Sequence, residues 1–289
     1  MSYQIFTDAT ADLSAEMLQG CPEVRVIPME VELGDRSCTY GPGGDLTAAE
    51  FYAAQRSGAF ATTSQINPAA FRDAFEPVLR EGQDILYIGL TSGLSGTIQN
   101  ALLCAEELRE DYPDRRVLCA DTCCASAGMG FLVREALLRQ QGGMELDALS
   151  AWLGEHCRNV AHWFTVDTFE HLRHGGRVSA ASAAIGTMLQ IKPLLTVDRE
   201  GKLKVAGKPR GRVAAIKTLV SKMEAEWTPE AGRLVGIAHG DCPEGAEQLK
   251  GAVLARFPEA DIRVTEIGPV IGSHTGPGML ALLYWGSGR

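Results

Sequence analysis

Residues Asp84–Leu108 read DILYIGLTSGLSGTIQNALLCAEEL, a stretch that predicts a strand, a turn and a helix in direct succession. The run Asp84–Leu90 is almost continuously apolar, as expected of a strand that is buried on both faces of a parallel sheet. We expect a helix at Ile98–Leu108, joined to the strand by the polar turn Thr91–Thr97. A strand that leads through such a turn into a helix is the repeating unit of α/β folds.

The same succession occurs twice more in the first half of the chain. A strand is expected at Tyr3–Thr7, followed by the small polar run Asp8–Ala11. A further strand at Arg116–Ala120 leads through the turn Asp121–Ser126 into a helix at Ala127–Gln141. This order predicts a doubly wound, mostly parallel sheet. The loops at the carboxyl ends of its strands should meet at one edge, where ligands bind in such folds.

The segment between the first two of these units is less regular. One long strand is expected at Val24–Leu33. The next stretch, Gly34–Asp45, is rich in glycine and other turn-forming residues and is expected to be a loop. A helix is expected at Thr47–Arg56, and Pro68 can open the first turn of the helix that follows it.

The sequence QQGG at residues 140–143 interrupts the pattern, and a second α/β region is expected after it. This region would contain a hairpin around Asp198–Lys202 and an amphipathic helix at Arg212–Trp227. We place the division near residue 150. The chain would then consist of an N-terminal α/β domain at residues 1–150 and a C-terminal α/β domain at residues 151–289.

The composition excludes several classes of protein. With 289 residues, of which 45% are hydrophobic, the chain can bury a core without crosslinks, which argues against disorder. A net charge of −9 without a long basic run argues against nucleic-acid binding. The start lacks the features of a signal peptide and no apolar run is long enough to span a bilayer, so a cytoplasmic protein is expected. The cysteines form no CxxC pair, which argues against a zinc site.

The turn Thr91–Thr97 is the sharpest local feature of the chain. It contains four hydroxyl side chains and two glycines, and it precedes a helix, whose N-terminus attracts carboxylate or phosphate groups. The simpler interpretation is that Ser95 caps the helix and binds nothing. Capping accounts for one hydroxyl only, so we favour an anion site.

His274 lies in the glycine-rich sequence SHTGPG. A single histidine can be a structural hydrogen-bonding group or a ligand-binding group, and the residues alone leave both interpretations open. A serine nucleophile at Ser95 would require glycine two residues away on either side. Gly93 satisfies this requirement but Thr97 does not, so serine hydrolysis is disfavoured.

Two further kinds of segment stand out. Arg177 in GGRV and Arg210 in KPRGR belong to the few positive clusters of an acidic chain, and a partner or a phosphate could use them. The run Ile185–Leu195, which includes Gly186 and Met188, is either core or the wall of a deep apolar cavity.

Taken together, these motifs resemble the DegV family of fatty-acid-binding proteins over nearly the whole chain. The resemblance is carried, in order, by TDATADLS (Thr7–Ser14), TSQ (Thr63–Gln65), TSGLSGT (Thr91–Thr97), Asp121–Thr122, HLRHGGRVSAASAAIGTMLQIKPLL (His171–Leu195), KPRGRVAAI (Lys208–Ile216) and HTGPG (His274–Gly278). This chain departs from the family pattern at Ala9, where serine is commoner, and at TSQIN, where TSQP is commoner. Neither change removes an expected carboxylate ligand.

The resemblance implies a two-domain α/β protein with one long-chain fatty acid buried between the domains. It implies a lipid carrier rather than an enzyme, without cofactor or metal, which presents the carboxylate to a separate ATP-dependent fatty acid kinase subunit. A transient contact with a membrane is a further expectation. The carboxylate would be held by Thr63, Ser64, Ser92 or Ser95, His274 and Thr275. The acyl chain would lie against Leu94, Phe164, Ile185, Gly186, Met188, Leu189 and Met279. Arg177 and Arg210 would dock the kinase.

Two alternatives belong to other classes of function. The first is a serine esterase or acyltransferase that uses Ser95 and His274. The second is a protein that binds another small anion, such as a sugar phosphate, at the same helix ends. A long apolar cavity would favour the fatty acid, and a short polar one would favour the phosphate.

Overall fold

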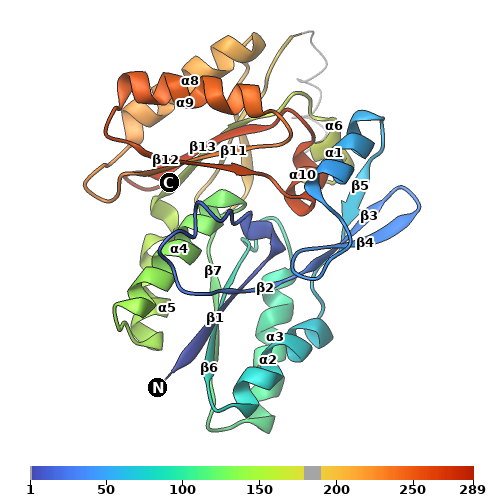
Figure 1. Ribbon diagram of the computed structural model, residues 1–289, viewed down its shortest axis with the longest axis vertical. Coiled ribbons are helices and arrows are strands. Elements are labelled where there is room, and N and C mark those ends of the chain that lie inside the picture. Colours follow the sequence, from blue (N-terminus) through green and yellow to red (C-terminus); the bar gives the residue numbers. More distant parts are fainter. Residues whose placement is uncertain (1, 179–189) are drawn as a thin grey trace.

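A computed structural model describes residues 2–178 and 190–289 of the chain. Its first sheet has the strand order β2-β1-β6-β7, and all neighbouring strands are parallel. Every residue of β6 is buried, as its apolar sequence predicted. The parallel sheet expected for the first half of the chain is therefore confirmed (Figure 1). Its strands are β1 (Tyr3–Asp8), β2 (Arg25–Ile27), β6 (Asp84–Gly89) and β7 (Val117–Asp121).

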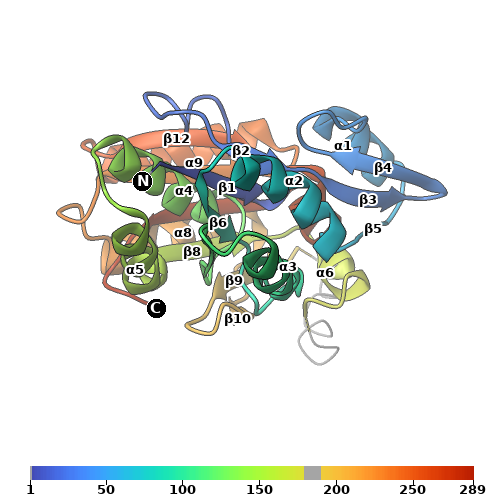
Figure 2. The same cartoon turned by 90° about the horizontal axis from the view of Figure 1, so that it is seen from below.

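Helices cover both faces of this sheet, so it is doubly wound. Figure 2 shows α2 (Pro68–Arg80) and α3 (Thr97–Asp111) on one side of the strands, and α4 (Ala127–Gln141) and α5 (Leu146–His156) on the other. The 3-10 turn η1 (Ala9–Ala11) follows β1 directly. All of the turns that follow β1, β6 and β7 thus meet at one end of the sheet, because parallel strands point the same way.

A smaller antiparallel sheet, with the order β4-β3-β5, lies beside the first (Figure 1). Its strands are β3 (Met29–Leu33), β4 (Arg36–Tyr40) and β5 (Ala61–Thr63), and α1 (Ala48–Arg56) connects β4 to β5. Thr47 begins α1 with a capping box, in which the Thr47 hydroxyl accepts from the backbone N–H of Glu50.

The sequence prediction was wrong at two points in this region. Val24–Leu33 is not one strand, because Pro28 cannot donate a backbone hydrogen bond and separates β2 from β3. Gly34–Asp45 is not a loop throughout, because it contains the whole of β4. Only Cys38 is buried in β4, so the alternation of apolar residues that marks a strand is missing there.

The second large sheet is mixed and has the order β10-β9-β8-β13-β11-β12. Helices α8 (Gly211–Glu226) and α9 (Pro243–Arg256) cover its outer face in Figure 1. The short helices α6 (Glu170–His174) and α10 (Pro269–Thr275) pack against each other near the smaller sheet. The 3-10 turn η2 (Cys157–Asn159) directly precedes β8, the strand of this sheet that comes first in the sequence. The strands are β8 (Val160–Thr165), β9 (Leu194–Val197), β10 (Leu203–Gly207), β11 (Leu234–His239), β12 (Asp261–Glu266) and β13 (Leu280–Trp285).

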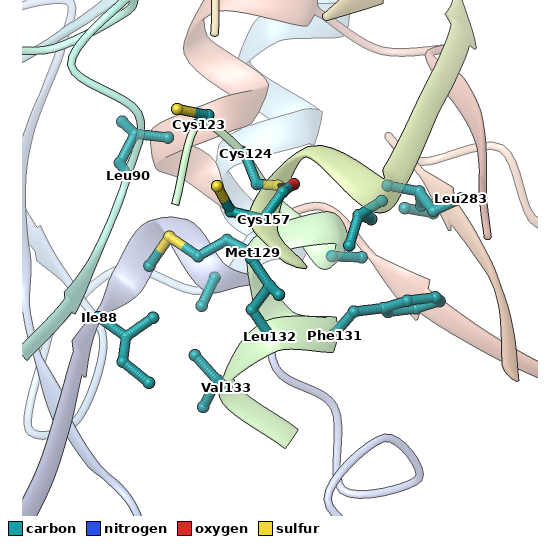
Figure 3. Packing of buried hydrophobic residues seen from close by; sticks show 14 of the residues in the cluster. Ile88, Leu90, Cys123, Cys124, Met129, Phe131, Leu132, Val133, Cys157 and Leu283 are labelled. Atoms are coloured by element: carbon teal, nitrogen blue, oxygen red, sulfur yellow. Dashed lines mark hydrogen bonds between the residues drawn. The ribbon is translucent and has the colours of Figure 1, made fainter. Parts of the chain in front are cut away.

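Helix α4 lies between the two large sheets and contacts β6 on one side and β8, β11 and β13 on the other. Because both of its faces are covered, Met129, Phe131, Leu132 and Val133 are fully buried (Figure 3). The two-domain α/β arrangement is therefore held together by a continuous apolar layer. The boundary near residue 150 stays a prediction, and the chain passes that residue within α5.

Candidate ligand-binding site

A cavity lies between the two domains, beside the inner face of the mixed sheet. It contains about 880 Å³ of space that no atom occupies, part of it open to solvent. Most of the side chains that line it are apolar: Met29, Leu90, Leu94, Ala125, Trp163, Phe164, Leu172, Val197, Leu203, Val270, Ile271, Met279, Ala281 and Leu283. The polar lining residues are Thr10, Thr63, Ser64, Gln65, Ser95, Ser126, His162, Arg177, His274 and Thr275.

One part of the cavity wall brings together polar groups from four separate segments. Thr63 ends β5, Ser95 lies in the turn before α3, Arg177 follows α6, and His274 lies in the last turn of α10. Helix α10 packs against both β5 and α6, which explains why groups so distant in the sequence meet here. We call Thr63, Ser95, Arg177 and His274 the polar cluster.

His274 is held by Thr63 and by a glycine. Thr63 Oγ1 lies 3.0 Å from His274 Nε2, a hydrogen-bond distance. A Cβ atom on Gly175 would lie 2.1 Å from His274 Nδ1, so only glycine allows α6 to approach the ring this closely. Among the described residues, the buried Nδ1 atom has no hydrogen-bond partner. The ring is thus fixed in position and keeps unused hydrogen-bonding capacity.

His274 is neutral at pH 7. Burial, together with the nearby positive charge of Arg177, lowers the pKa of its imidazole to about 4. A neutral imidazole offers one N–H donor and one acceptor. The hydrogen bond between Thr63 and His274 uses one of the two protons of this pair, so the pair can donate one hydrogen bond to an anion. Ser95 can donate a second, while Arg177 supplies the charge.

Arg177 is tied to the site from two directions. Its Nε donates to Leu94 O at 3.2 Å, in the turn before α3, and its Nη1 donates to the carbonyl oxygen of Gly175. Burial lowers the pKa of its guanidinium, which nevertheless stays protonated because its reference pKa is so high. The positive charge therefore lies at the cavity wall rather than in solution.

Ser95 combines the two roles that the sequence left open. Its Oγ accepts from the backbone N–H of Thr97 at 3.2 Å and lies 3.0 Å from Thr97 Oγ1, so it satisfies one N–H of the first turn of α3, although the N-cap residue of this helix is Gly96. It also lines the cavity. Ser92, by contrast, is exposed and is not among the lining residues, because the turn directs it outward and its N–H donates to Asp121 Oδ2. The structure therefore separates the two serines.

The remaining predicted residues fall into three groups. Ser64, Thr275, Leu94, Phe164 and Met279 all line the cavity. Arg210 is exposed at the start of α8 and does not line it. Four predicted acyl-chain residues lie outside the described residues, and the structure places none of them: Ile185, Gly186, Met188 and Leu189.

His274 does not lie in a glycine-rich loop as predicted. Pro269 opens a short helix in its first turn, and this helix continues through Thr275. It ends because Gly276 adopts a φ of +73°, which other residues rarely adopt. Gly276 thus ends the helix one residue after His274, whose ring lines the cavity.

The TDATADLS segment forms a buried brace, not an anion site. Asp8 accepts from Tyr87 Oη at 2.5 Å and from the N–H of Thr10 at 2.9 Å, and burial raises the pKa of its carboxyl. Burial raises the pKa of Asp12 to about 7, and Ser126 Oγ donates to it at 2.5 Å. These pairs connect η1 to β6 and to the start of α4.

Sequence reasoning missed four polar lining residues. Thr10 and Gln65 belong to motifs that were quoted for the family resemblance, so a signal for them existed. Ser126 ends the turn after β7, where ligand contacts are common. His162 lies in the apolar strand β8, and nothing in its local sequence marks it as a cavity residue.

Other chemistry finds little support in the described residues. Within residues 2–178 and 190–289, no group of three or more His, Cys, Asp or Glu could hold a metal ion. In the same part of the chain, none of the helices has the length and apolar character to cross a membrane. The hydrogen-bond partner of His274 Nε2 is Thr63, and no hydrogen bond joins Ser95 to His274 among the residues that the structure describes.

Known proteins have a similar sequence and fold. The family model described as "Uncharacterised protein, DegV family" matches residues 2–286. A DegV domain-containing protein of Clostridium perfringens is 37% identical over 98% of this chain and 97% of its own length. The structure described as fatty acid binding of a DegV family protein from Thermus thermophilus has a TM-score of 0.86 and 32% identity, and covers 99% of this chain and 100% of its own.

A more distant structure has the same fold. It is the fatty acid kinase B3 protein of Streptococcus pneumoniae, loaded with linoleic acid, with a TM-score of 0.87, 19% identity and 99% coverage of both chains. The match to the family model spans nearly the whole sequence, and the relative from Clostridium aligns over almost its full length. The chain belongs to the DegV family, as its motifs predicted.

Proposed function

We propose that this protein binds one long-chain fatty acid, with the carboxylate at the polar cluster and the acyl chain along the apolar cavity. The observation that carries the proposal is the unequal distribution of polarity in one cavity. Hydroxyls, an imidazole and an arginine gather where four segments meet, and the wall is otherwise mainly apolar. A relative with 32% identity, from Thermus thermophilus, is described as binding fatty acid.

The energetics of such a ligand match this arrangement. Burying a chain of about 16 carbons supplies on the order of 12 kcal/mol of apolar driving force, at ~0.8 kcal/mol per methylene. Ligand immobilisation offsets much of it. A carboxylate that enters the protein must be paired, because an unpaired buried charge costs several kcal/mol. Arg177 supplies the opposite charge, and Ser95 and the hydrogen-bonded pair of Thr63 and His274 each supply one hydrogen bond.

We also propose that the bound carboxylate is presented to a separate ATP-dependent kinase subunit, which converts it to an acyl phosphate. The support is a likeness of fold to the fatty acid kinase B3 protein, together with the position of the head group. Ser64 and Gln65 line the cavity and are exposed, so the carboxylate end lies near the protein surface. Arg177, in the cavity wall, and Arg210, exposed at the start of α8, stay the candidates for kinase docking.

Organic extraction of the purified protein, followed by mass spectrometry, tests the proposal. We expect close to one fatty acid per chain, or uptake of one after delipidation and incubation with palmitate. The matched control is the same extraction from Arg177→Met protein, which should retain less lipid. Wild-type protein that is folded but neither contains nor takes up a fatty acid would disprove the proposed function.

A further inference from the structure

The cavity has a second end, remote from the polar cluster, where a histidine forms part of the wall. Met279, Ala281 and Leu283 alternate along β13 and point to the same face of the sheet. Because a strand rises roughly 3.3 Å per residue, Leu283 lies roughly 13 Å beyond Met279, which follows α10 closely. Leu283 pairs with His162 on the neighbouring strand β8. His162 and Leu283 therefore mark the deep end of the cavity.

The ring of His162 is held rigidly by protein atoms on both of its nitrogens. Its Nδ1–H donates to Val160 O at 3.0 Å, since a carbonyl can only accept. The N–H of Ala125 donates weakly to its Nε2 at 3.4 Å. The residue is 4% exposed, and burial lowers the pKa of its imidazole to about 3, so the ring is neutral. Its polar atoms are thus engaged away from the cavity, and the ring is a stiff, uncharged wall.

The ring also rests against a glycine of α4. A Cβ atom on Gly128 would lie 1.9 Å from His162 Nε2, which is too close for two heavy atoms that are not bonded to each other. Any side chain at Gly128 must therefore displace the imidazole. Helix α4 is buried on its other side by the core, so the ring can move only toward the cavity.

We propose that His162, supported by Gly128, is the residue that limits the length of the bound acyl chain. A leucine at this depth could change rotamer and make room for a longer chain, whereas the hydrogen bonds of His162 fix the wall. The inference rests on the proposed function, because it assumes that the ligand enters with its carboxylate at the polar cluster. It concerns the chain-length specificity of the fatty-acid site: acids up to a set chain length are accepted, and longer acids are excluded.

Competition between chain lengths tests the inference. Delipidated wild-type protein and its variants are incubated with an equimolar mixture of saturated C14, C16, C18 and C20 acids, and the bound acids are measured by mass spectrometry. For His162→Ala, the ratio of the longest bound acid to the preferred wild-type acid should rise roughly tenfold, equivalent to ~1.4 kcal/mol. For Gly128→Ala, the profile should shift toward shorter acids.

Two further variants make the result decisive. Leu282→Ala removes a buried side chain from the opposite face of β13, next to Leu283, and should leave the profile unchanged. His162→Val retains a side chain that favours a strand and should shift the profile in the same direction as alanine, so a poorly folded alanine variant does not end the test. An unchanged profile in folded His162→Ala or His162→Val protein would overturn the inference. Failure of the wild-type protein to bind any acid would instead overturn the proposed function.

Discussion

Thr63 offers the most direct test of how the carboxylate is held. Its hydroxyl lies 3.0 Å from His274 Nε2 and faces the cavity at the end of β5. Thr63→Val replaces the hydroxyl by a methyl group and keeps the branched shape that suits a strand. The substitution removes one donor to the carboxylate and also removes the partner that orients the ring of His274.

The expected loss follows from the value of a hydrogen bond to a charged group. Such a bond contributes about 1.5–3 kcal/mol, so the affinity for palmitate should fall roughly 10- to 150-fold. Displacement of a fluorescent fatty acid measures this change. Thr63→Ser, which retains the hydroxyl, should recover most of the affinity.

The matched control is Thr62→Val on the same strand. Thr62 is exposed and its neighbour Thr63 points to the other face, so this variant should bind as the wild type does. Thermal unfolding should give closely similar midpoints for all three variants. Unchanged affinity in a folded Thr63→Val protein would show that the head group does not lie at Thr63.

Three further outcomes follow from the site and from the buried brace. Ser95→Ala should weaken fatty acid binding whereas Ser92→Ala should not, as measured by the same displacement assay; equal effects would contradict the separation of the two serines. Gly175→Ala should reduce both binding and the thermal midpoint, because the new methyl group would overlap the ring of His274; unchanged values for both would refute the tight approach of α6. The pKa of Asp12 is raised to about 7 in the folded protein, so the unfolded chain loses its proton first as pH rises from about 4 to 7. The stability of the wild-type protein toward urea should fall across this pH window, and the stability of the Asp12→Asn variant should fall less. An equal slope of stability against pH in both proteins would exclude Asp12 as the cause.

Much of the fold follows from local sequence. The run Asp84–Leu90 is almost continuously apolar and predicts a strand, and Pro68 predicts the start of a helix. Both elements appear in the structure where they were expected. The second part of the chain also has its predicted hairpin and amphipathic helix. These features depend on hydrophobic periodicity and on the fixed geometry of proline, which act over a few residues.

The smaller sheet could not be predicted in this way. Strand β4 has one buried residue and is stabilised by pairing with β3, so its apolar pattern is too weak to detect. The separation of β2 from β3 places neighbouring segments in different sheets. Which sheet a strand joins depends on contacts between distant parts of the chain rather than on the residues of the strand itself.

The site shows the same limit. Two serines of one turn are equivalent in sequence, and their different directions result from packing of the turn on the β9–β10 hairpin: a Cβ atom on Gly93 would lie 2.7 Å from Gly201 O. Arg177 was expected to dock the kinase on the surface, yet it is half-buried and donates to Leu94 O. Its role in docking stays a prediction, and its place in the cavity wall is visible only in three dimensions.

A crystal structure with bound palmitate tests the central claim most directly. We expect continuous electron density that begins with the carboxylate within hydrogen-bond distance of Thr63 and His274, and that ends near His162 and Leu283. Density with the carboxylate at the His162 end, or a cavity that stays empty in the presence of saturating palmitate, would contradict the account.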